Sequence, residues 1–274
     1  MADGREPMTP APPSCSLPVW RAGEDGWQAQ PDTVAEECPV ALVYNGISHA
    51  VMMATPADLP DFALGFSLSE GIIQRPDQLY DVDIVAAAAG LELRLDIASA
   101  CQQALQQRRR QLAGRTGCGV CGVEALAQLP LQPPAVTHTQ TLQVAALAKA
   151  FTALQQQQPL FASTGASHAA GWWTADGQLA LVREDVGRHN ALDKLIGARS
   201  RRTELTAGCL LLSSRASYEM LYKAAQAGIE IVVSLSAPTA LAVRLAEQAG
   251  QTLLRWHPRH GVALYSHPQR VKQG

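Results

Sequence analysis

The sequence predicts an α/β fold in which helices flank a mixed sheet, and three observations support this class. In the C-terminal half, apolar runs typical of strands alternate with segments of helical periodicity, which predicts parallel strands joined by helical connections. Each half also contains two apolar runs separated by turn residues, which predicts one β-hairpin per half. The chain has 274 residues, 47% of them hydrophobic, which is enough for one large domain or two smaller ones.

The N-terminal part is predicted to begin with an arm. Residues 1–35 are rich in Pro, Gly and isolated charges and show no periodicity, so we expect them to be loosely ordered. An α+β region over 36–130 follows. Its first element is a hairpin, because apolar runs over 40–44 and 47–54 enclose Asn45-Gly46, a pair typical of a type I′ turn.

The rest of this region contains both helix and strand. Apolar residues recur at helical spacing over 57–70, and Gly71 can adopt the positive φ of a helix end. Strands are predicted over 82–88 and 91–97, and in the second of these leucines alternate with charged residues, which indicates one buried face. Ser99 is expected to begin a polar helix, which ends before a glycine-rich loop.

Residues 135–274 are predicted to form an α/β region with a ligand crevice at the ends of its strands. Helices are inferred from apolar periodicity and from cap or glycine residues at their ends, and strands from short aliphatic runs. The elements, in order, are a helix over 142–154, strands over 171–174 and 179–183, a helix that Asp185 caps and that ends at Gly197, a strand over 208–213, a helix over 217–227, a strand over 229–234, a helix over 238–249 and a strand over 252–256.

A loop over 117–122 carries two cysteines, Cys118 and Cys121, which are separated by two residues and surrounded by glycines. A dinucleotide-binding G-x-G-x-x-G would have to follow a strand and be followed about 20 residues later by an acidic residue. Here the loop follows an arginine-rich helix, and no Asp or Glu occurs over 125–175. A structural zinc site would need further ligands at metal spacing, which the sequence does not supply, so no metal site is predicted.

Thiol chemistry is the third interpretation of this loop. The thiolate is the reactive form of cysteine, and the cation of Arg115 beside the loop would favour that form. The flanking glycines allow wide backbone movement, which a group that carries sulfur between two proteins requires. A persulfide carrier and a disulfide exchanger both fit, so Cys118 and Cys121 are the candidate catalytic residues.

Two further sets of residues are candidates for ligand binding. Asp185, His189 and Asp193 are spaced to share one helix face, which fits either a site in which a carboxylate orients His189 or a solvated helix face. Ser213 and Arg215 follow a predicted strand, where hydroxyl and guanidinium groups can bind an anion or simply cap the next helix. A phosphorylated or nucleotide-like ligand would suit this position.

Charge and hydropathy argue against several classes of protein. Nucleic-acid-binding domains are usually strongly basic, whereas this chain has a net charge of −2, so we expect no nucleic acid partner. No apolar run approaches the roughly 18 residues that a membrane-spanning helix needs, so we expect no membrane partner. The first residues lack the basic and apolar stretches of a secretion signal, which favours a cytoplasmic location.

Together and in this order, these motifs resemble those of the formate dehydrogenase accessory sulfurtransferases, the FdhD family. The similarity covers nearly the whole chain. The matching segments are Pro39 to Gly46, Phe62 to Phe66, Ser69 to Ile73, Thr116 to Gly122, Arg183 to Gly197, Ser213 to Met220 and Tyr265 to Arg270.

The resemblance implies a cytidine-deaminase-like fold, usually as a homodimer. It also implies that the protein accepts persulfide sulfur from a cysteine desulfurase and passes it to the molybdenum cofactor, bis-molybdopterin guanine dinucleotide, of formate dehydrogenase. Cys118 would carry the persulfide, and Cys121 would assist. Deaminase activity is not implied, because the H-x-E and P-C-x-x-C zinc signature of that fold is absent from the sequence.

In this family, the segment after the last strand of the sheet contacts the guanine-dinucleotide cofactor. We therefore expect the cofactor to be a client ligand, with no cofactor tightly bound. Arg215 and Arg259 would hold its diphosphate groups through paired hydrogen bonds. A cofactor-binding chaperone without thiol chemistry and a disulfide oxidoreductase are the alternatives. The candidate cofactor-binding residues are Trp256, His257, Pro258, Arg259, His260, Gly261, Ser213, Arg215, Arg183 and His189.

Overall fold

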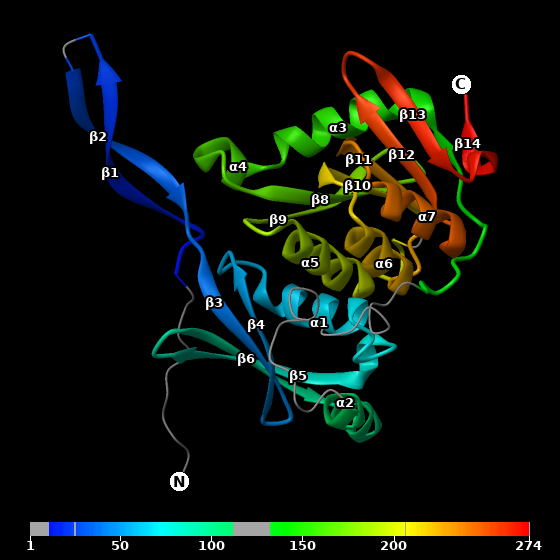
Figure 1. Ribbon diagram of the computed structural model, residues 1–274, viewed down its shortest axis with the longest axis horizontal. Coiled ribbons are helices and arrows are strands. Elements are labelled where there is room, and N and C mark those ends of the chain that lie inside the picture. The colour runs from blue at the N-terminus through cyan, green and yellow to red at the C-terminus, as the bar shows by residue number, and fades with distance from the viewer. Residues whose placement is uncertain (1–10, 25, 112–131, 206, 274) are drawn as a thin grey trace.

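The computed structural model describes residues 11–24, 26–111, 132–205 and 207–273, and it confirms the mixed α/β class. Figure 1 shows three parts: a six-stranded sheet with its helices, a four-stranded sheet below it, and a hairpin arm that projects to one side. No helix of the described part is both long enough and apolar enough to cross a membrane.

The six-stranded sheet has the strand order β13-β12-β11-β10-β8-β9. Its strands β10, β11 and β12 run parallel, as the alternation of strands and helices predicts, and the other neighbours pair antiparallel. The strands are β8 (His168–Thr174), β9 (Leu179–Asp185), β10 (Gly208–Arg215), β11 (Ile231–Ser236), β12 (Thr252–His257) and β13 (Gly261–Ser266).

Helices cover both faces of this sheet (Figure 1). Leu210 and Leu212 face a core shared with three helices, and Leu211 between them faces a second core that includes Phe151 of a fourth helix. This alternation follows from the two-residue period of a strand. The first three helices are α5 (Arg188–Ser200), α6 (Tyr218–Gln226) and α7 (Ala240–Ala249), and the fourth is α3 (Leu147–Gln156), which is followed by α4 (Pro159–Thr164).

The helix predicted over 142–154 begins five residues later than expected. Its first residues form the short strand β7 (Leu142–Gln143) and the 3-10 turn η3 (Val144–Ala146). β7 pairs in parallel with β14 (Val271–Lys272), which follows the 3-10 turn η4 (Pro268–Arg270). Because this pairing partner lies far away in the sequence, the local pattern does not reveal it.

The four-stranded sheet has the order β4-β3-β6-β5 and packs on α1. The predicted type I′ hairpin is confirmed, since Asn45 and Gly46 both have positive φ, 46° and 80°. The alternation in β6 is confirmed as well, because Leu93 and Leu95 are buried against α1. The elements are β3 (Cys38–Tyr44), β4 (Ile47–Ala54), α1 (Leu59–Ser69), η1 (Pro76–Gln78), β5 (Leu79–Ala87), β6 (Gly90–Ile97) and α2 (Ser99–Gln111).

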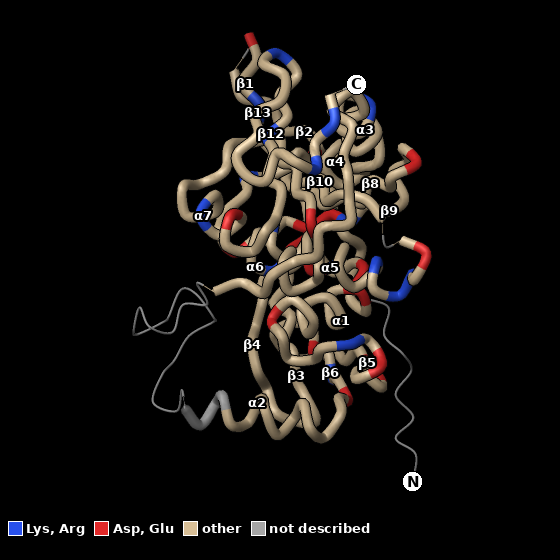
Figure 2. Tube along the Cα trace, turned by 90° about the vertical axis from the view of Figure 1, so that its right-hand side faces the viewer, with Lys and Arg blue, Asp and Glu red and all other residues tan. Residues whose placement is uncertain are grey.

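Helices α1 and α5 join the two sheets, and the side view in Figure 2 shows them between the four-stranded part and the six-stranded part. Two glycines allow the backbones of these helices to touch. A Cβ atom on Gly65 would overlap the carbonyl oxygen of Asp193, and a Cβ atom on Gly197 would overlap that of Asp61. The helices therefore pack at a distance that no larger residue would permit at these positions.

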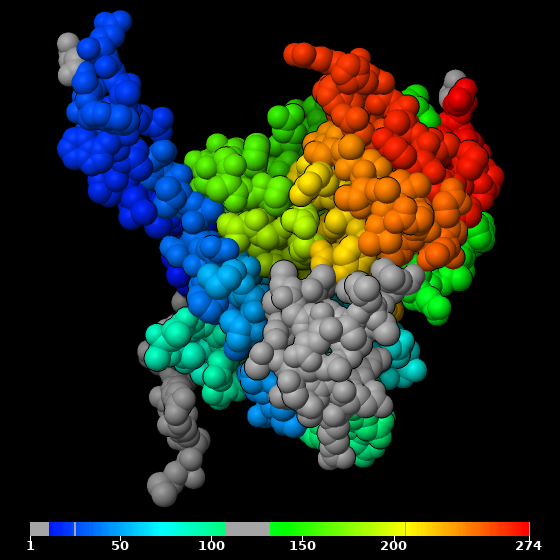
Figure 3. Space-filling model, in the orientation of Figure 1, coloured from blue at the N-terminus to red at the C-terminus, as the bar shows by residue number. Residues whose placement is uncertain are grey.

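The N-terminal arm is more ordered than the sequence predicts. Residues 1–10 of the predicted loosely ordered arm lie outside the described residues, but over the rest of it β1 (Ser14–Gly23) and β2 (Gly26–Ala35) form an antiparallel hairpin. Most residues of this hairpin are exposed on both faces, so no alternation of apolar and polar residues marks its strands in the sequence. Figure 3 shows the arm standing away from the rest of the chain.

Candidate functional site

The candidate site is the edge of the six-stranded sheet at which β9, β10, β11 and β12 end. β9 and β10 are both antiparallel to β8, so they point the same way, and β10, β11 and β12 are parallel. Helices α5, α6 and α7 follow β9, β10 and β11 and begin at this edge. Ligands of α/β sheets bind at such an edge because helix N-termini present unpaired N–H groups there.

Ser213 and Arg215 lie at this edge, at the end of β10. Arg215 is opposite Ser236 in the register of β10 and β11, and its exposed side chain makes no hydrogen bond or ion pair with another described residue. The Ser213 hydroxyl is already engaged, since its oxygen accepts a hydrogen bond from the Ala169 N–H at 2.8 Å. Arg215 is therefore available to a ligand, whereas Ser213 holds β8 to β10.

The segment selected by the family resemblance forms the end of β12, the following turn and the first residue of β13. Partial burial and the positive charges of His260, Arg255 and Arg259 lower the pKa of His257, which favours its neutral form at pH 7. The rings of His257 and His260 stack with their centroids 4.5 Å apart. The segment comprises Trp256, His257, Pro258, Arg259, His260 and Gly261.

Asp185 does not cap a helix, contrary to the prediction. It is the last residue of β9, and α5 begins at Arg188 with Gly187 as its N-cap. The predicted helix face shared by Asp185, His189 and Asp193 is therefore wrong. The error arises because β9 extends to Asp185, so the helical spacing does not apply to that residue.

The two aspartates instead form buried ion pairs. Asp185 Oδ2 lies 2.6 Å from Lys194 Nζ, and both side chains are fully buried. Asp193 Oδ2 lies 2.9 Å from Lys223 Nζ. Burial raises the pKa of Asp193, although the charge of Lys223 and a hydrogen bond from Ser69 act in the opposite direction. These pairs hold elements together and do not face the sheet edge as free groups.

His189 belongs to a polar cluster at the candidate site. Its Nε2 lies 2.6 Å from Oε2 of Glu219 in the first turn of α6. This contact is the main reason why the pKa of Glu219 is lowered, and the charge of Arg188 lowers it further. His168, at the start of β8, has a pKa lowered by partial burial and by the charges of Arg188 and His189. The cluster therefore brings together His168, Arg188, His189 and Glu219.

Among the buried donor atoms that have no hydrogen-bond partner in the described part of the chain, three lie near this sheet edge: Arg188 Nε, Ser217 Oγ and Arg255 Nε. Arg188 and Ser217 stand where α5 and α6 begin, and Arg255 is near the end of β12. Leaving a buried donor unpaired costs about 1–3 kcal/mol, so donors gathered at a sheet edge fit a ligand rich in acceptor oxygens. These three residues and Glu219 are not among the site residues predicted from the sequence, although Arg188 and Ser217 directly follow strand-to-helix turns.

Arg183 has protein partners elsewhere. Its guanidinium donates to Asp61 Oδ2 at 2.7 and 2.9 Å and lies 3.5 Å from Asp58. Asp61 also accepts a hydrogen bond from Arg201 at 2.6 Å. These contacts join β9 and α5 to the start of α1, so Arg183 connects the two parts of the chain.

The candidate catalytic residues Cys118 and Cys121 lie outside the described residues. Among the described cysteines, Cys101 and Cys209 are buried, and burial raises the pKa of Cys209 to about 12, which keeps it in the unreactive thiol form. The described part of the chain contains no group of three or more His, Cys, Asp or Glu residues placed to hold a metal ion.

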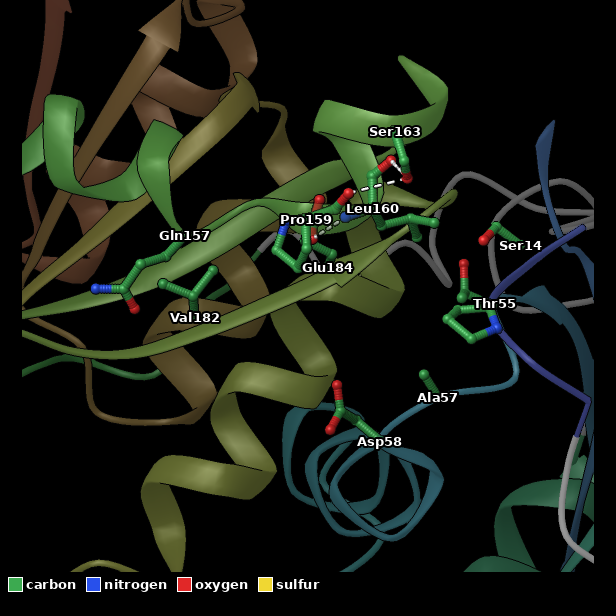
Figure 4. A pocket seen from close by; sticks show the side chains of 11 residues that line it. Ser14, Thr55, Ala57, Asp58, Gln157, Pro159, Leu160, Ser163, Val182 and Glu184 are labelled. Carbon is green, nitrogen blue, oxygen red and sulfur yellow. Dashed lines mark hydrogen bonds between the residues drawn. The ribbon is translucent and has the colours of Figure 1, made fainter. Parts of the chain in front are cut away.

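A cavity of about 350 Å³ lies away from these residues, between the base of the arm, α4 and β9. Figure 4 shows the side chains that line it, including those of Ser14, Thr55 and Asp58. The Glu184 carboxylate in its wall accepts hydrogen bonds from the N–H groups of Leu160 and Phe161, both at 2.9 Å, so it supports the start of α4. None of the candidate site residues lines this cavity.

Comparisons with known proteins give the family. The model of the FdhD/NarQ family matches residues 35–272, which is most of the chain. The chain belongs to the FdhD/NarQ family. The predicted family resemblance is thus confirmed.

Named relatives in the FdhD/NarQ family align with nearly the whole of this chain. A relative from Cupriavidus necator is 54% identical over 259 residues, which are 92% of this chain and 88% of the relative. One from Xanthomonas campestris pv. campestris is 51% identical over 98% of this chain and 96% of its own. Both are named sulfur carrier protein FdhD.

A solved structure supports the fold. It comes from Desulfotalea psychrophila and is assigned provisionally as a formate dehydrogenase accessory protein. It superposes with a TM-score of 0.74 at 23% identity, covering 95% of this chain and all of the other. At this identity, the comparison speaks for the fold alone.

Proposed function

We propose that this chain is a cytoplasmic sulfur carrier that accepts persulfide sulfur from a cysteine desulfurase and delivers it to the bis-molybdopterin guanine dinucleotide of formate dehydrogenase. Relatives that are 50–54% identical carry the name sulfur carrier protein FdhD, which supports sulfur transfer. The observation that carries the ligand assignment is the group of unpartnered buried donors at the sheet edge, because a guanine dinucleotide brings diphosphate oxygens to such donors.

The chemistry assigns different tasks to the two loop cysteines. The Cys118 thiolate attacks the outer sulfur of the donor's persulfide, so that a new S–S bond forms on Cys118 and the donor cysteine leaves as a thiolate. The Cys121 thiolate then attacks the inner sulfur of this persulfide. A Cys118–Cys121 disulfide forms while the outer sulfur leaves as sulfide for the cofactor, and a cellular dithiol restores both thiols.

The sheet edge would hold the cofactor while sulfur is delivered. Arg215 is exposed at the end of β10, and Arg259 lies in the turn after β12, so their guanidinium groups can bind diphosphate oxygens in pairs. The contact between His189 and Glu219 fixes the imidazole beside Arg188. These residues orient the ligand without covalent chemistry.

Mass spectrometry tests the sulfur-carrier step. After incubation with a cysteine desulfurase and cysteine, the intact chain is expected to gain one sulfur, about 32 Da. Cys118→Ala should abolish this gain, whereas Cys15→Ser, which changes a partly exposed thiol in the arm, should keep it. Absence of the gain with a competent donor would instead favour a cofactor-binding chaperone, and reduction of insulin without any donor would favour a disulfide oxidoreductase.

Calorimetry with GDP as the probe tests the binding edge. Arg215→Gln is expected to weaken GDP binding about tenfold or more, because one charge-assisted hydrogen bond is worth about 1.5–3 kcal/mol. Arg94→Gln is the matched control, since Arg94 is also an exposed strand arginine but pairs with Glu92 on the other sheet. Equal affinity of the two variants would remove Arg215 from the binding site.

A further inference from the structure

A carboxylate lies among the cations of the candidate site. Glu219 is in the first turn of α6, shortly after Arg215 at the end of β10. Its Oε2 lies 2.6 Å from His189 Nε2, whereas its Oε1 makes no hydrogen bond with another described residue. The contact with His189 and the charge of Arg188 lower the pKa of Glu219, so this group is negatively charged at pH 7.

Phosphate oxygens alone do not account for this charge. Arg215, Arg255 and Arg259 bring positive charge to the ends of β10 and β12, as a site for an anion requires. Glu219 would repel a phosphate placed against it, because like charges repel strongly where water is partly excluded. A fixed carboxylate at this edge therefore indicates that another part of the ligand brings hydrogen-bond donors to it.

A guanine base carries such donors. Its N1–H and its 2-amino group point in the same direction, so one carboxylate can accept hydrogen bonds from both. Each carboxylate oxygen has two lone pairs, so Oε2 of Glu219 can accept a hydrogen bond from the base while it contacts His189. Adenine presents the lone pair of its N1 at the same place, which a carboxylate repels.

Arg188 supplies the complementary donors. It is the first residue of α5, next to His189, and its Nε is buried without a hydrogen-bond partner among the described residues. Guanine has two acceptors, O6 and N7, and arginine can donate to both of them at once. A guanidinium and a carboxylate at the starts of two neighbouring helices therefore match two edges of one guanine base.

The start of α6 presents its polar groups in an order that suits a nucleotide. Ser217 lies between Arg215 and Glu219 in the sequence, and its Oγ is buried without a hydrogen-bond partner in the described part of the chain. A guanidinium, a hydroxyl and a carboxylate thus follow one another. This order corresponds to the diphosphate, the ribose and the base of a bound nucleotide.

We propose that Glu219 and Arg188 select guanine in the ligand: Glu219 accepts hydrogen bonds from N1–H and the 2-amino group, and Arg188 donates to O6 and N7. The contact with His189 keeps the Glu219 carboxylate on the side of α6 that faces α5. The inference rests on the proposed function, in which a guanine dinucleotide binds at this edge, and it adds the groups that distinguish guanine from other bases.

Calorimetry of the full chain with GDP, IDP and ADP tests the proposal. IDP lacks the 2-amino group, and ADP lacks N1–H as well. The unchanged chain is expected to bind IDP about tenfold and ADP about 100-fold more weakly than GDP, because each missing donor leaves a carboxylate oxygen unpaired. Glu219→Gln should reduce the preference for GDP over IDP to about threefold or less, since a neutral amide accepts more weakly. It should also improve ADP binding relative to GDP, because an amide can donate to N1 of adenine.

Glu247→Gln is the matched control. Glu247 is also a helix carboxylate close to a histidine, with 3.4 Å between its Oε2 and His267 Nε2, but it lies near the end of α7, away from the sheet edge. This variant should keep all three affinities. Affinity ratios are compared within one variant, so a general weakening of the site leaves them unchanged. Equal affinities of the unchanged chain for GDP and ADP, or an unchanged GDP-to-IDP ratio in Glu219→Gln, overturns the proposal.

A guanine analogue tests the assignment of Arg188. In 7-deaza-GDP a carbon replaces N7, so the base cannot accept a hydrogen bond at that position. The unchanged chain is expected to bind this analogue about tenfold more weakly than GDP, which is the effect of one lost hydrogen bond to a charged group. Arg188→Met should bind the two compounds equally. If this variant still distinguishes them, Arg188 is not the group that contacts N7.

The outcomes separate this inference from the proposed function. If the unchanged chain does not bind GDP, the guanine ligand of the proposed function and the present inference are both overturned. If it binds GDP without preference for the base, only the present inference is overturned. Glu219→Gln should still gain one sulfur, about 32 Da, from a cysteine desulfurase, because the exchange at Cys118 does not use Glu219.

Discussion

Lys194 has no exposed side-chain surface, and its ammonium is held by groups from two other segments of the chain. Nζ lies 2.6 Å from Asp185 Oδ2 and donates to the Thr55 carbonyl oxygen at 3.0 Å. Asp185 also accepts a hydrogen bond from the Thr55 N–H at 3.0 Å. Lys194 thus fixes the segment after β4 to the end of β9, beside the start of α5.

Lys194→Met is expected to lower the free energy of unfolding by about 3–5 kcal/mol, because it leaves the Asp185 carboxylate buried without a cation. Urea denaturation at pH 7 measures this change. Arg75→Met is the control, since the ion pair of Arg75 with Asp77 is exposed and should contribute less than about 1 kcal/mol. Similar losses for the two variants would contradict the assignment.

The lowered pKa of Glu230 predicts that the stability of the fold depends on pH. Burial acts to raise its pKa, but hydrogen bonds from the side chains of Thr137 and Thr139 and from the N–H groups of Thr139 and Gln140 outweigh burial and lower it. A carboxyl group with a lowered folded-state pKa stabilises the fold above its unfolded-state pKa, about 4.3, and loses this contribution as pH falls through the folded-state value.

Glu230→Gln should therefore cost about 1–3 kcal/mol at pH 7, since it replaces an acceptor of charged hydrogen bonds. The difference from the unchanged chain should shrink as pH falls below about 4.3. Urea denaturation at several pH values gives this difference, and Glu92→Gln, an exposed carboxylate on the other sheet, is the control. A difference that is constant with pH would exclude the lowered pKa as its source.

Among single residues, a position at the sheet edge could be predicted from the sequence, whereas the contacts between side chains could not. Arg215 could be placed at the sheet edge because it follows an apolar strand run. The contact between His189 and Glu219 could not be predicted, since it joins α5 and α6 across 30 residues of sequence and depends on how these helices lie on the sheet. Asp185 was misplaced because a strand end and a helix cap look alike in sequence.

At the scale of elements, the packing of α1 on α5 predicts a strict size limit. Gly65→Ala or Gly197→Ala should destabilise the chain by about 3 kcal/mol or more, because each added methyl group would overlap a backbone carbonyl of the facing helix. Thermal and urea unfolding measure the loss.

Gly23→Ala is the control for these two variants. The φ of Gly23 is not in the left-handed region, and the nearest atom to an added Cβ is 3.7 Å away, so this change should be close to neutral. If Gly65→Ala were equally neutral, α1 and α5 could move apart without loss of stability, which would contradict the predicted size limit.

The elements that the sequence predicted well carry their own signal. β6 shows a two-residue alternation because one face packs on α1. The β3–β4 hairpin is marked by its turn residues, Asn45-Gly46. The arm strands and β13 lack such alternation, since few of their residues are buried. Propensity alone does not distinguish an exposed ribbon from an irregular chain.

At the scale of the whole molecule, buried polar contacts make the two sheets one folding unit. Asp185 on β9 holds Thr55 after β4, and Asp193 on α5 accepts a hydrogen bond from Ser69 of α1 at 2.6 Å. Unfolding one part would leave these buried groups of the other part without partners, which costs several kcal/mol.

We therefore expect amides in β6 and β10 to open with the same free energy. Native-state hydrogen exchange at Leu93 and Leu211, both fully buried, should give opening free energies that agree within about 1 kcal/mol. An amide in the exposed arm, such as that of Gln28, which lies in a hydrogen-bonded pair with Arg21, should open at lower free energy and serves as the internal reference. A lower value for Leu93 alone would show that the four-stranded part unfolds separately.

The pairing of β7 with β14 also sets an order of events during protein synthesis. Residues 137–143 are held by Glu230, by Arg270, which donates to the Thr137 carbonyl oxygen at 2.7 Å, and by the strand Val271–Lys272. The ribosome adds these last residues roughly 130 positions after β7, which takes several seconds at about 5–20 residues per second. Residues 137–143 therefore gain this anchor only after the last strand of the six-stranded sheet, β13 (Gly261–Ser266), has been synthesised, so a nascent chain can complete that sheet before this segment is fixed.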